Sequence, residues 1–170
     1  MHRIKALLSA LAITIATVAA WIGLTAPAQA ATCYWYSGQA GTSSNCDNRD
    51  PDALGSACGS DAQTVKSVTL KNIYTGATNK FVLDLRYSGN CRTAWARLRN
   101  ADGASPADNA GCTVWIHRNS DGQEYSKRPP ASTYGVSIWT NVVYDADVTS
   151  YARAYCDTGT AEYEGRTANW

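Results

Sequence analysis

The chain has 170 residues, and its 15 lysines and arginines nearly balance 14 aspartates and glutamates, for a formal net charge of +1 at pH 7. This near-neutral balance excludes the strong basic field of a nucleic-acid-binding protein and argues equally against electrostatic docking to anionic lipid. Removing a leader of 30 residues from the 170 leaves 140, which is enough chain for one domain with its own core.

The segment 1–30 has the three-part order of a cleavable secretory signal peptide. A short basic start precedes an apolar run over 6–24, and the small residues Ala28 and Ala30 follow in the positions that signal peptidase requires. We therefore expect an exported protein whose mature part, residues 31–170, is a single extracellular domain that no longer carries a membrane span.

Two alternatives remain for this leader. The apolar run is nearly long enough to cross a bilayer as an uncleaved anchor, although the small-residue site directly after it favours cleavage. The other alternative is lipidation of Cys33. Residues 30–32 form a weak lipidation box, and the modification would leave an odd number of cysteines to pair.

All six cysteines lie in the mature part, and an even number in an exported chain predicts disulfides. The alternative is a metal site, which the spacing disfavours because there is no Cys-x-x-Cys pair and His117 is the single histidine after the leader. Sequence cannot select among the possible pairings. We expect near neighbours to join: Cys33–Cys46, Cys58–Cys91 and Cys112–Cys156.

Residues 37–63 are rich in Gly, Ser, Asn and Asp, which predicts a loop region. Within it, Asn48, Asp50 and Asp52 stand at alternate positions, as at the start of a calcium loop. The glycine and the carboxylate that complete such a loop are missing. We therefore interpret these residues as Asx-turn caps and expect no metal site.

From residue 64 onward, strand patterns dominate. Strand-compatible residues cover 64–74, and an aromatic and leucine face alternates with a more polar one over 81–88. The glycine-containing stretch 75–79 predicts a hairpin turn between them. The segment 91–99 has helical propensity, but the turn before it favours a strand that pairs back on 81–88. Further strands are expected later in the chain, over 112–118, 137–144, 150–156 and 161–170. Short strands at this spacing predict an all-β domain, either a small disulfide-stapled β-sandwich or a barrel-like fold.

The mature part keeps five of the six tryptophans and all ten tyrosines but has one phenylalanine. A preference for Tyr and Trp over Phe suits half-wet surfaces, where rings stack on sugars or on partner side chains. Trp95, Trp115 and Trp139 lie inside predicted strands and are expected in the core. The aromatic residues at chain ends and in loops are the predicted ligand-binding group: Tyr34, Trp35, Tyr36, Tyr134 and Trp170. Ordinary packing is the alternative for all of them.

Catalytic patterns are weak. His117 lies in a predicted strand and no nucleophile elbow is present, so a Ser-His-Asp site is not expected. A glycosidase needs a pair of carboxylates, but no pattern selects a pair among four candidates: Asp84, Glu124, Asp145 and Asp147.

Several stretches resemble a known family. Cys-Asp-Asn-Arg-Asp-Pro at 46–51 is followed by Leu-Arg-Tyr-Ser at 85–88, Cys-Arg-Thr-Ala-Trp-Ala-Arg at 91–97 and Trp-Thr-Asn-Val-Val-Tyr-Asp at 139–145. This pattern resembles domain-of-unknown-function family 2690 of exported Gram-positive, chiefly actinobacterial proteins, in its longer, YjfA-like form. Where that family usually has glycine, this chain has Asn48, which also tolerates a left-handed conformation. The resemblance implies an extracellular β domain and no reaction, cofactor or catalytic residue.

Within the resembling stretches, two arginines on neighbouring predicted strands need partners, because a buried unpaired guanidinium is very costly. Arg86 and Arg97 can each hydrogen-bond a carboxylate, for which Asp84 is the candidate, or buried carbonyls, with Tyr87 and Trp95 packed beside them. We interpret these five residues as a structural polar cluster. A ligand pocket is the alternative.

Together these observations predict a secreted, non-catalytic binding protein, without a cofactor, whose partner is an extracellular glycan or another protein. A secreted hydrolase of envelope polymers is the alternative. A secreted inhibitor or toxin is the third possibility. It would need a protruding loop, such as the basic, proline-stiffened segment 126–130, or oligomers that expose a membrane-facing belt. The sequence leaves the oligomeric state open.

Overall fold

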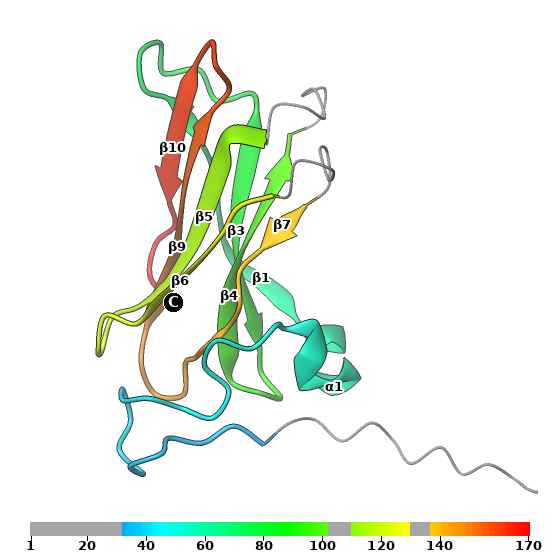
Figure 1. Cartoon of the computed structure of the whole chain (residues 1–170), viewed down its shortest axis with the longest axis vertical. Helices are drawn as coiled ribbons and strands as arrows, with labels where there is room; N and C mark the ends of the chain where they lie inside the picture. Colours follow the sequence, from blue (N-terminus) through cyan, green and yellow to red (C-terminus); the bar gives the residue numbers. More distant parts are fainter. Residues whose placement is uncertain (1–31, 102–109, 130–136) are drawn as a thin grey trace, which may run out of the picture.

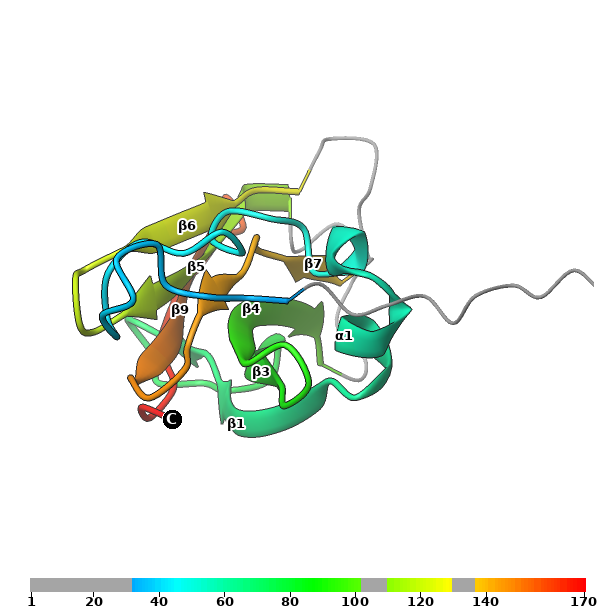
Figure 2. The same ribbon diagram turned by 90° about the horizontal axis from the view of Figure 1, so that it is seen from below.

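The computed structural model describes residues 32–101, 110–129 and 137–170, so the predicted leader lies outside the described residues. These residues form two antiparallel sheets that pack face to face (Figure 1). Figure 2 shows the two sheets from below as two layers, with β5, β6 and β9 in one and β1, β3 and β4 in the other. Neither sheet closes on itself within the described residues, so the sandwich is confirmed and the barrel is not formed.

The first sheet has the order β1–β3–β4–β7, and β8 pairs with another part of β4. Its strands are β1 (Gln63–Thr69), β3 (Phe81–Ser88), β4 (Thr93–Asn100), β7 (Ile138–Trp139) and β8 (Val143–Tyr144). β3 and β4 form a hairpin whose register runs from Phe81 opposite Asn100 to Ser88 opposite Thr93. The strand expected over 91–99 is therefore confirmed in place of a helix.

The second sheet has the order β2–β10–β9–β5–β6. Its strands are β2 (Lys71–Asn72), β10 (Glu162–Arg166), β9 (Ser150–Asp157), β5 (Cys112–Arg118) and β6 (Glu124–Lys127). The single strand expected over 64–74 is wrong, because the chain changes sheets at Leu70. β1 pairs with β3, whereas β2 pairs with β10. After the turn predicted around 75–79, the chain therefore returns to pair with β1 and not with β2.

The core lies between the sheets. The leucine face of β3 points inward as expected, and Leu70 is fully buried at the point where the chain crosses over. Gly165 of β10 permits this crossing, since a Cβ there would lie 3.1 Å from Cδ1 of Leu70. Each fully buried Leu, Ile or Phe contributes about 1.5–3 kcal/mol of hydrophobic stabilisation.

The three disulfides form in the expected pairing. Cys112–Cys156 links β5 to β9 at directly opposed positions. Cys33–Cys46 and Cys58–Cys91 hold the segment before β1, which contains η1 (Asp52–Leu54) and α1 (Ser56–Ser60). Three disulfides are typical of an oxidising compartment such as the cell exterior. In the described part of the chain, no helix has the length and apolar character needed to cross a bilayer.

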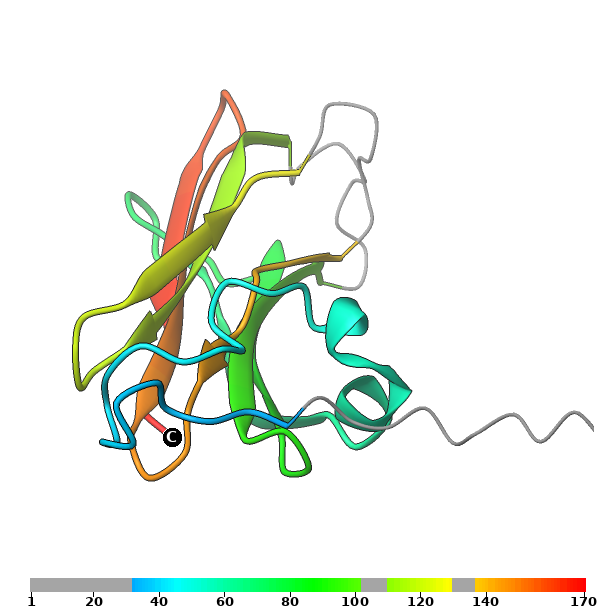
Figure 3. The same ribbon diagram turned by 60° about the horizontal axis from the view of Figure 1, so that its bottom comes forward.

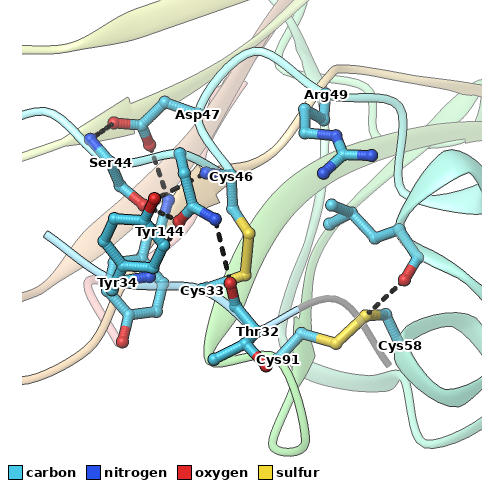
Figure 4. The surroundings of a disulfide bond; sticks show 12 residues. Thr32, Cys33, Tyr34, Ser44, Cys46, Asp47, Arg49, Cys58, Cys91 and Tyr144 are labelled. Atoms are coloured by element: carbon cyan, nitrogen blue, oxygen red, sulfur yellow. Dashed lines mark hydrogen bonds between the residues drawn. A yellow bond between two sulfur atoms is a disulfide. The ribbon is translucent and has the colours of Figure 1, made fainter. Parts of the chain in front are cut away.

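A second, smaller core fixes this N-terminal segment across one end of the sandwich (Figure 3). Asp47 accepts hydrogen bonds from the backbone N–H groups of Ser44 and Tyr144, each at 2.8 Å, beside the Cys33–Cys46 disulfide (Figure 4). Leu54 and Trp95 are buried in the same cluster. The end of β4 is therefore covered on its outer side by chain that precedes β1.

Candidate functional site

The predicted ligand-binding aromatics do not form one patch in the described structure. Tyr34 and Tyr36 are 53% and 63% exposed and meet edge to face, with ring centroids 5.8 Å apart. Trp170 is also exposed, but its ring contacts are with Tyr87 and with the Lys66 ammonium. Tyr134 lies outside the described residues. A binding role for these residues therefore stays a prediction.

Trp35 is half-buried, in contrast to the exposure expected for a chain-end ring. Its ring centroid lies 4.6 Å from that of Tyr144, and the Arg118 guanidinium lies 4.9 Å from its ring centroid. Because both partners belong to the second core and its edge, Trp35 anchors the N-terminal segment on the sandwich.

Only one of the three tryptophans expected in the core is buried. Trp95 is buried, but Trp115 is half-buried and Trp139 is 38% exposed. In β5 the inward positions belong to Val114 and Ile116, so Trp115 must face the opposite side. Trp139 sits opposite Arg97, in a strand of two residues at the sheet edge.

The outer face of the second sheet carries a cleft with a volume of about 740 Å³, which we name the outer cleft. It extends to the sheet edge where the chain passes from β1 to β2. Its lining residues are Val68, Thr69, Lys71, Trp115, Arg153, Ala154, Tyr155, Glu164, Gly165 and Arg166.

The position of the outer cleft follows from the alternation of small and large residues along β9. Its alanines and Cys156 face the core, while Tyr151, Arg153 and Tyr155 face outward. Strand pairing then sets Arg153 opposite both Trp115 of β5 and Arg166 of β10. Directly opposed residues share one face of a sheet, so aromatic and cationic side chains from three strands meet there.

Arg153 is held in place by two contacts. Its guanidinium carbon lies 4.2 Å from the Trp115 ring centroid, within cation–π range. Its Nε and Nη2 donate to the two carboxylate oxygens of Glu124, at 3.1 and 2.8 Å. This bidentate bond lowers the pKa of Glu124 and raises the pKa of Arg153. Both groups are therefore ionised at neutral pH.

Tyr155 closes one side of the outer cleft and is fixed by Glu162. Its hydroxyl donates to Oε2 of Glu162 at 2.7 Å, and Tyr74 donates to Oε1 at 3.0 Å. The hydrogen bond to Glu162 raises the pKa of Tyr155 to about 12. Tyr155 therefore keeps its proton and presents a ring of fixed orientation.

The same face continues past the cleft through stacked side chains. Arg166 lies 3.7 Å from the Tyr151 ring centroid, and the Tyr151 ring lies 4.7 Å from that of His117. The face therefore offers flat apolar surfaces, oriented cations and carboxylates. Such a surface suits the binding of a polar ligand with flat apolar faces.

The structure brings together only some of the residues of the predicted polar cluster on the first sheet. Asp84 is almost completely buried and accepts from Arg97 Nη2 at 2.7 Å, while Arg99 Nε also donates to it at 3.2 Å. Burial raises the pKa of Asp84, but the bonds from Arg97, Ser67 and Arg99 outweigh it, and the net shift is downward.

Of the two kinds of partner expected for Arg86, the structure shows a carbonyl and not the Asp84 carboxylate. Its Nη1 donates to Thr64 Oγ1 at 2.8 Å and its Nη2 to the Ala62 carbonyl at 2.7 Å. Tyr87 lies on the face of β3 opposite to Arg86, and its ring centroid lies 6.3 Å from that of Trp170. Trp95 is directly opposite Arg86, as the cluster requires.

One of the three loop residues that resembled a calcium motif, Asp50, caps a turn. Asp50 Oδ1 accepts from the Asp52 N–H at 2.9 Å, which is an Asx turn. Asn48 has a φ of 62°, so the left-handed turn is kept without glycine. In the basic segment, Arg128 Nε donates to Thr113 Oγ1 at 2.8 Å, and Pro130 lies outside the described residues.

The candidate carboxylates of a hydrolase are engaged elsewhere. Asp84 and Glu124 bind arginines, and Asp147 pairs with Arg92 at 2.8 Å. Asp145 is buried and accepts from Ser150 Oγ at 3.0 Å. None of these four lines the outer cleft.

Sequence reasoning missed the outer cleft, although it had a signal. The run Tyr151-Ala152-Arg153-Ala154-Tyr155 alternates small and large residues with the strand period. A strand whose small residues face the core must present its aromatic and cationic residues to solvent.

Comparison with known proteins gives two matches. A family model described as a protein of unknown function (DUF2690) matches residues 44–153, more than half of the chain. The uncharacterized protein YjfA of Bacillus subtilis (strain 168) is 34% identical over 103 residues, which is 56% of this chain and 62% of that relative. The match thus spans less than two thirds of the relative's length. No solved structure matches the chain.

Proposed function

The chain belongs to the DUF2690 family of proteins of unknown function, and we propose that it is a secreted, non-catalytic protein that binds an extracellular glycan in the outer cleft. One observation carries the proposal: Trp115, Tyr155 and Arg153 meet in a single cleft on an open sheet face. A sugar ring has an apolar face that packs on aromatic side chains and hydroxyl groups that bond to fixed polar groups.

Charge points to an acidic glycan. The cleft lining includes the cations Lys71, Arg153 and Arg166 but one carboxylate, Glu164. Glu124 pairs with Arg153 and Glu162 holds Tyr155 beside the cleft, so the cations left for a ligand are the exposed Lys71 and Arg166. Charge-assisted bonds to ligand carboxylates are about twice as strong as neutral ones. We therefore expect peptidoglycan, which carries carboxylates, to bind better than neutral chitin or cellulose.

Secretion is part of the proposal. Three disulfides suit an oxidising compartment, and the sequence before Ala31 has the order of a signal peptide. Intact-mass analysis of protein exported by a Gram-positive host should give a chain that starts at Ala31. A retained leader in the exported protein would contradict cleavage.

The binding test is a sedimentation assay of the purified protein with insoluble peptidoglycan, chitin and cellulose. We expect retention on peptidoglycan, and at least about a tenfold weaker affinity, equal to 1.4 kcal/mol, in Trp115→Ala and Arg166→Gln. Arg166 is exposed, so its replacement leaves the fold intact. Tyr34→Ala and Trp170→Ala are the matched controls, because both rings are exposed outside the cleft.

Each result of this assay decides between sites. If the control variants lost binding and the cleft variants kept it, the binding site would be the chain-end aromatic residues and not the outer cleft. Retention on none of the three polymers would contradict glycan binding, and equal retention on all three would contradict the preference for acidic groups.

A further inference from the structure

The outer face of the first sheet carries a separate groove, with a volume of about 340 Å³, which we name the arginine groove. The groove lies between the η1–α1 segment and the end of β7. Its lining residues are Pro51, Asp52, Gly59, Ala62, Arg86, Trp95, Arg97, Ser137 and Trp139. All of them fall within the stretch that matches the family model.

Strand pairing builds the floor of this groove. Arg86 of β3 is opposite Trp95 of β4, and Arg97 of β4 is opposite Trp139 of β7. Two guanidinium groups therefore lie on one face, each directly opposite a tryptophan. Trp139 is 38% exposed, whereas Trp95 is largely covered.

Both guanidinium groups are fixed by the protein and keep donors for a ligand. The bonds made within the described residues use two nitrogens of Arg86, toward Thr64 and Ala62. They likewise use two nitrogens of Arg97, toward Asp84. A guanidinium has five N–H donors, so each arginine has donors to spare and needs no reorganisation to bind.

The local charge is positive. Arg86, Arg97 and the adjacent Arg99 face Asp84 underneath and Asp52 at the rim. Burial and the nearby Arg97 charge lower the pKa of Arg86, since two cations are held close together. An anion in the groove would relieve this repulsion.

We propose that the arginine groove binds an oxyanion, a carboxylate or a phosphate, whose planar or apolar body lies against Trp139. Arg86 and Arg97 donate hydrogen bonds to the oxyanion, a geometry in which charge-assisted and bidentate bonds are the strongest available. This site is on the opposite sheet from the outer cleft, so it does not depend on glycan binding there.

The test is calorimetric and fluorescence titration of the purified protein with four probes. Benzoate and phenyl phosphate carry both an oxyanion and a ring, benzyl alcohol carries the ring alone, and acetate carries the anion alone. We expect benzoate or phenyl phosphate to bind at least about tenfold more tightly than benzyl alcohol and acetate. The difference between benzoate and phenyl phosphate identifies the preferred oxyanion.

Matched variants separate the groove from general charge. Arg86→Gln and Trp139→Ala should each weaken binding of the preferred probe about tenfold. Arg99→Gln removes a charge from the same cluster but lies outside the groove lining, so it should change binding less than about threefold. Gly59→Leu adds bulk at the groove wall, where a Cβ meets no atom within 4 Å, and should block binding without unfolding the protein.

Two outcomes would overturn the proposal. One is absence of binding by both ring-bearing anions in the correctly folded wild-type protein. The other is equal weakening by Arg86→Gln and Arg99→Gln, which would reduce the effect to nonspecific charge attraction.

Discussion

Nη1 of Arg118 lies 2.7 Å from Oδ1 of Asp47, and solvent does not reach the arginine side chain. The same guanidinium pairs with Asp121 and donates to the carbonyls of Thr42 and Tyr144. One side chain of β5 therefore ties the N-terminal segment and β8 to the second sheet. Since the contacts come from three separate stretches of chain, at 42–47, at 121 and at 144, the segment docks in one register.

This relationship predicts a large loss of stability in Arg118→Met. The substitution leaves Asp47 and Asp121 without their cation, and breaking a buried pair in this way costs about 3–5 kcal/mol. Urea unfolding measures the difference. Arg92→Gln is the control, because its pair with Asp147 is exposed and should contribute about 0–1 kcal/mol. Similar losses in both variants would contradict the account.

The pH dependence of stability should carry the signature of Asp145. Burial raises the pKa of Asp145 to about 7, and the Ser150 hydrogen bond offsets only part of that. Its pKa in the unfolded chain is about 3.9. Between about pH 4 and pH 7 the folded state therefore keeps a proton that the unfolded chain releases, so this group makes the free energy of unfolding fall as pH rises.

Asp145→Asn should remove that fall, by an amount on the order of 2–4 kcal/mol at pH 8 relative to pH 4. Urea midpoints at several pH values measure it. The carboxyls of Asp84 and Glu124, whose pKa values are lowered, act in the opposite direction and below about pH 4. Asp147→Asn serves as the exposed control. A pH profile that Asp145→Asn leaves unchanged would refute a raised pKa.

The disulfides should differ in their contribution to stability. Cys112–Cys156 closes a longer stretch of chain than Cys33–Cys46, with sequence separations of 44 and 13. The entropy of loop closure predicts about 4 kcal/mol for the first and about 3 kcal/mol for the second. Both cysteines of the longer loop are also fully buried. Paired Cys→Ala variants, compared by urea unfolding, should show the larger loss for 112 and 156, and the reverse order would contradict this ranking.

Sequence patterns predicted the longer strands from residue 81 onward, and the preference for near neighbours predicted the observed disulfide pairing. Leu83 and Leu85 alternate with polar residues and point inward as the strand period requires. The sheet change at Leu70 could not be predicted, because 64–74 is a continuous stretch of strand-compatible residues with no glycine or proline to mark the change. Only packing against Gly165 shows that the two ends of this stretch belong to different sheets.

The candidate sites were harder to predict, because they depend on which face of a strand meets the core. The sequence placed Trp115 and Val114 on opposite faces but did not say which residue is inside, and a large ring is a natural choice for a core. In the structure Val114 faces the core, where it lies against the inward side of β9, which carries alanines and Cys156. For Arg86 the sequence left a carboxylate and a carbonyl open as partners, and its donors reach the Ala62 carbonyl just before β1 and the Thr64 hydroxyl within it.

The central claim, that the outer cleft binds an acidic glycan, is tested most directly by NMR. The ¹⁵N-labelled protein is titrated with soluble peptidoglycan fragments, and shifts of backbone and indole N–H signals are mapped. The account predicts saturable shifts at the Trp115 indole and along β9 and β10, lost in Trp115→Ala. Saturable shifts confined to residues outside the outer cleft, or no shifts at millimolar fragment, would contradict it.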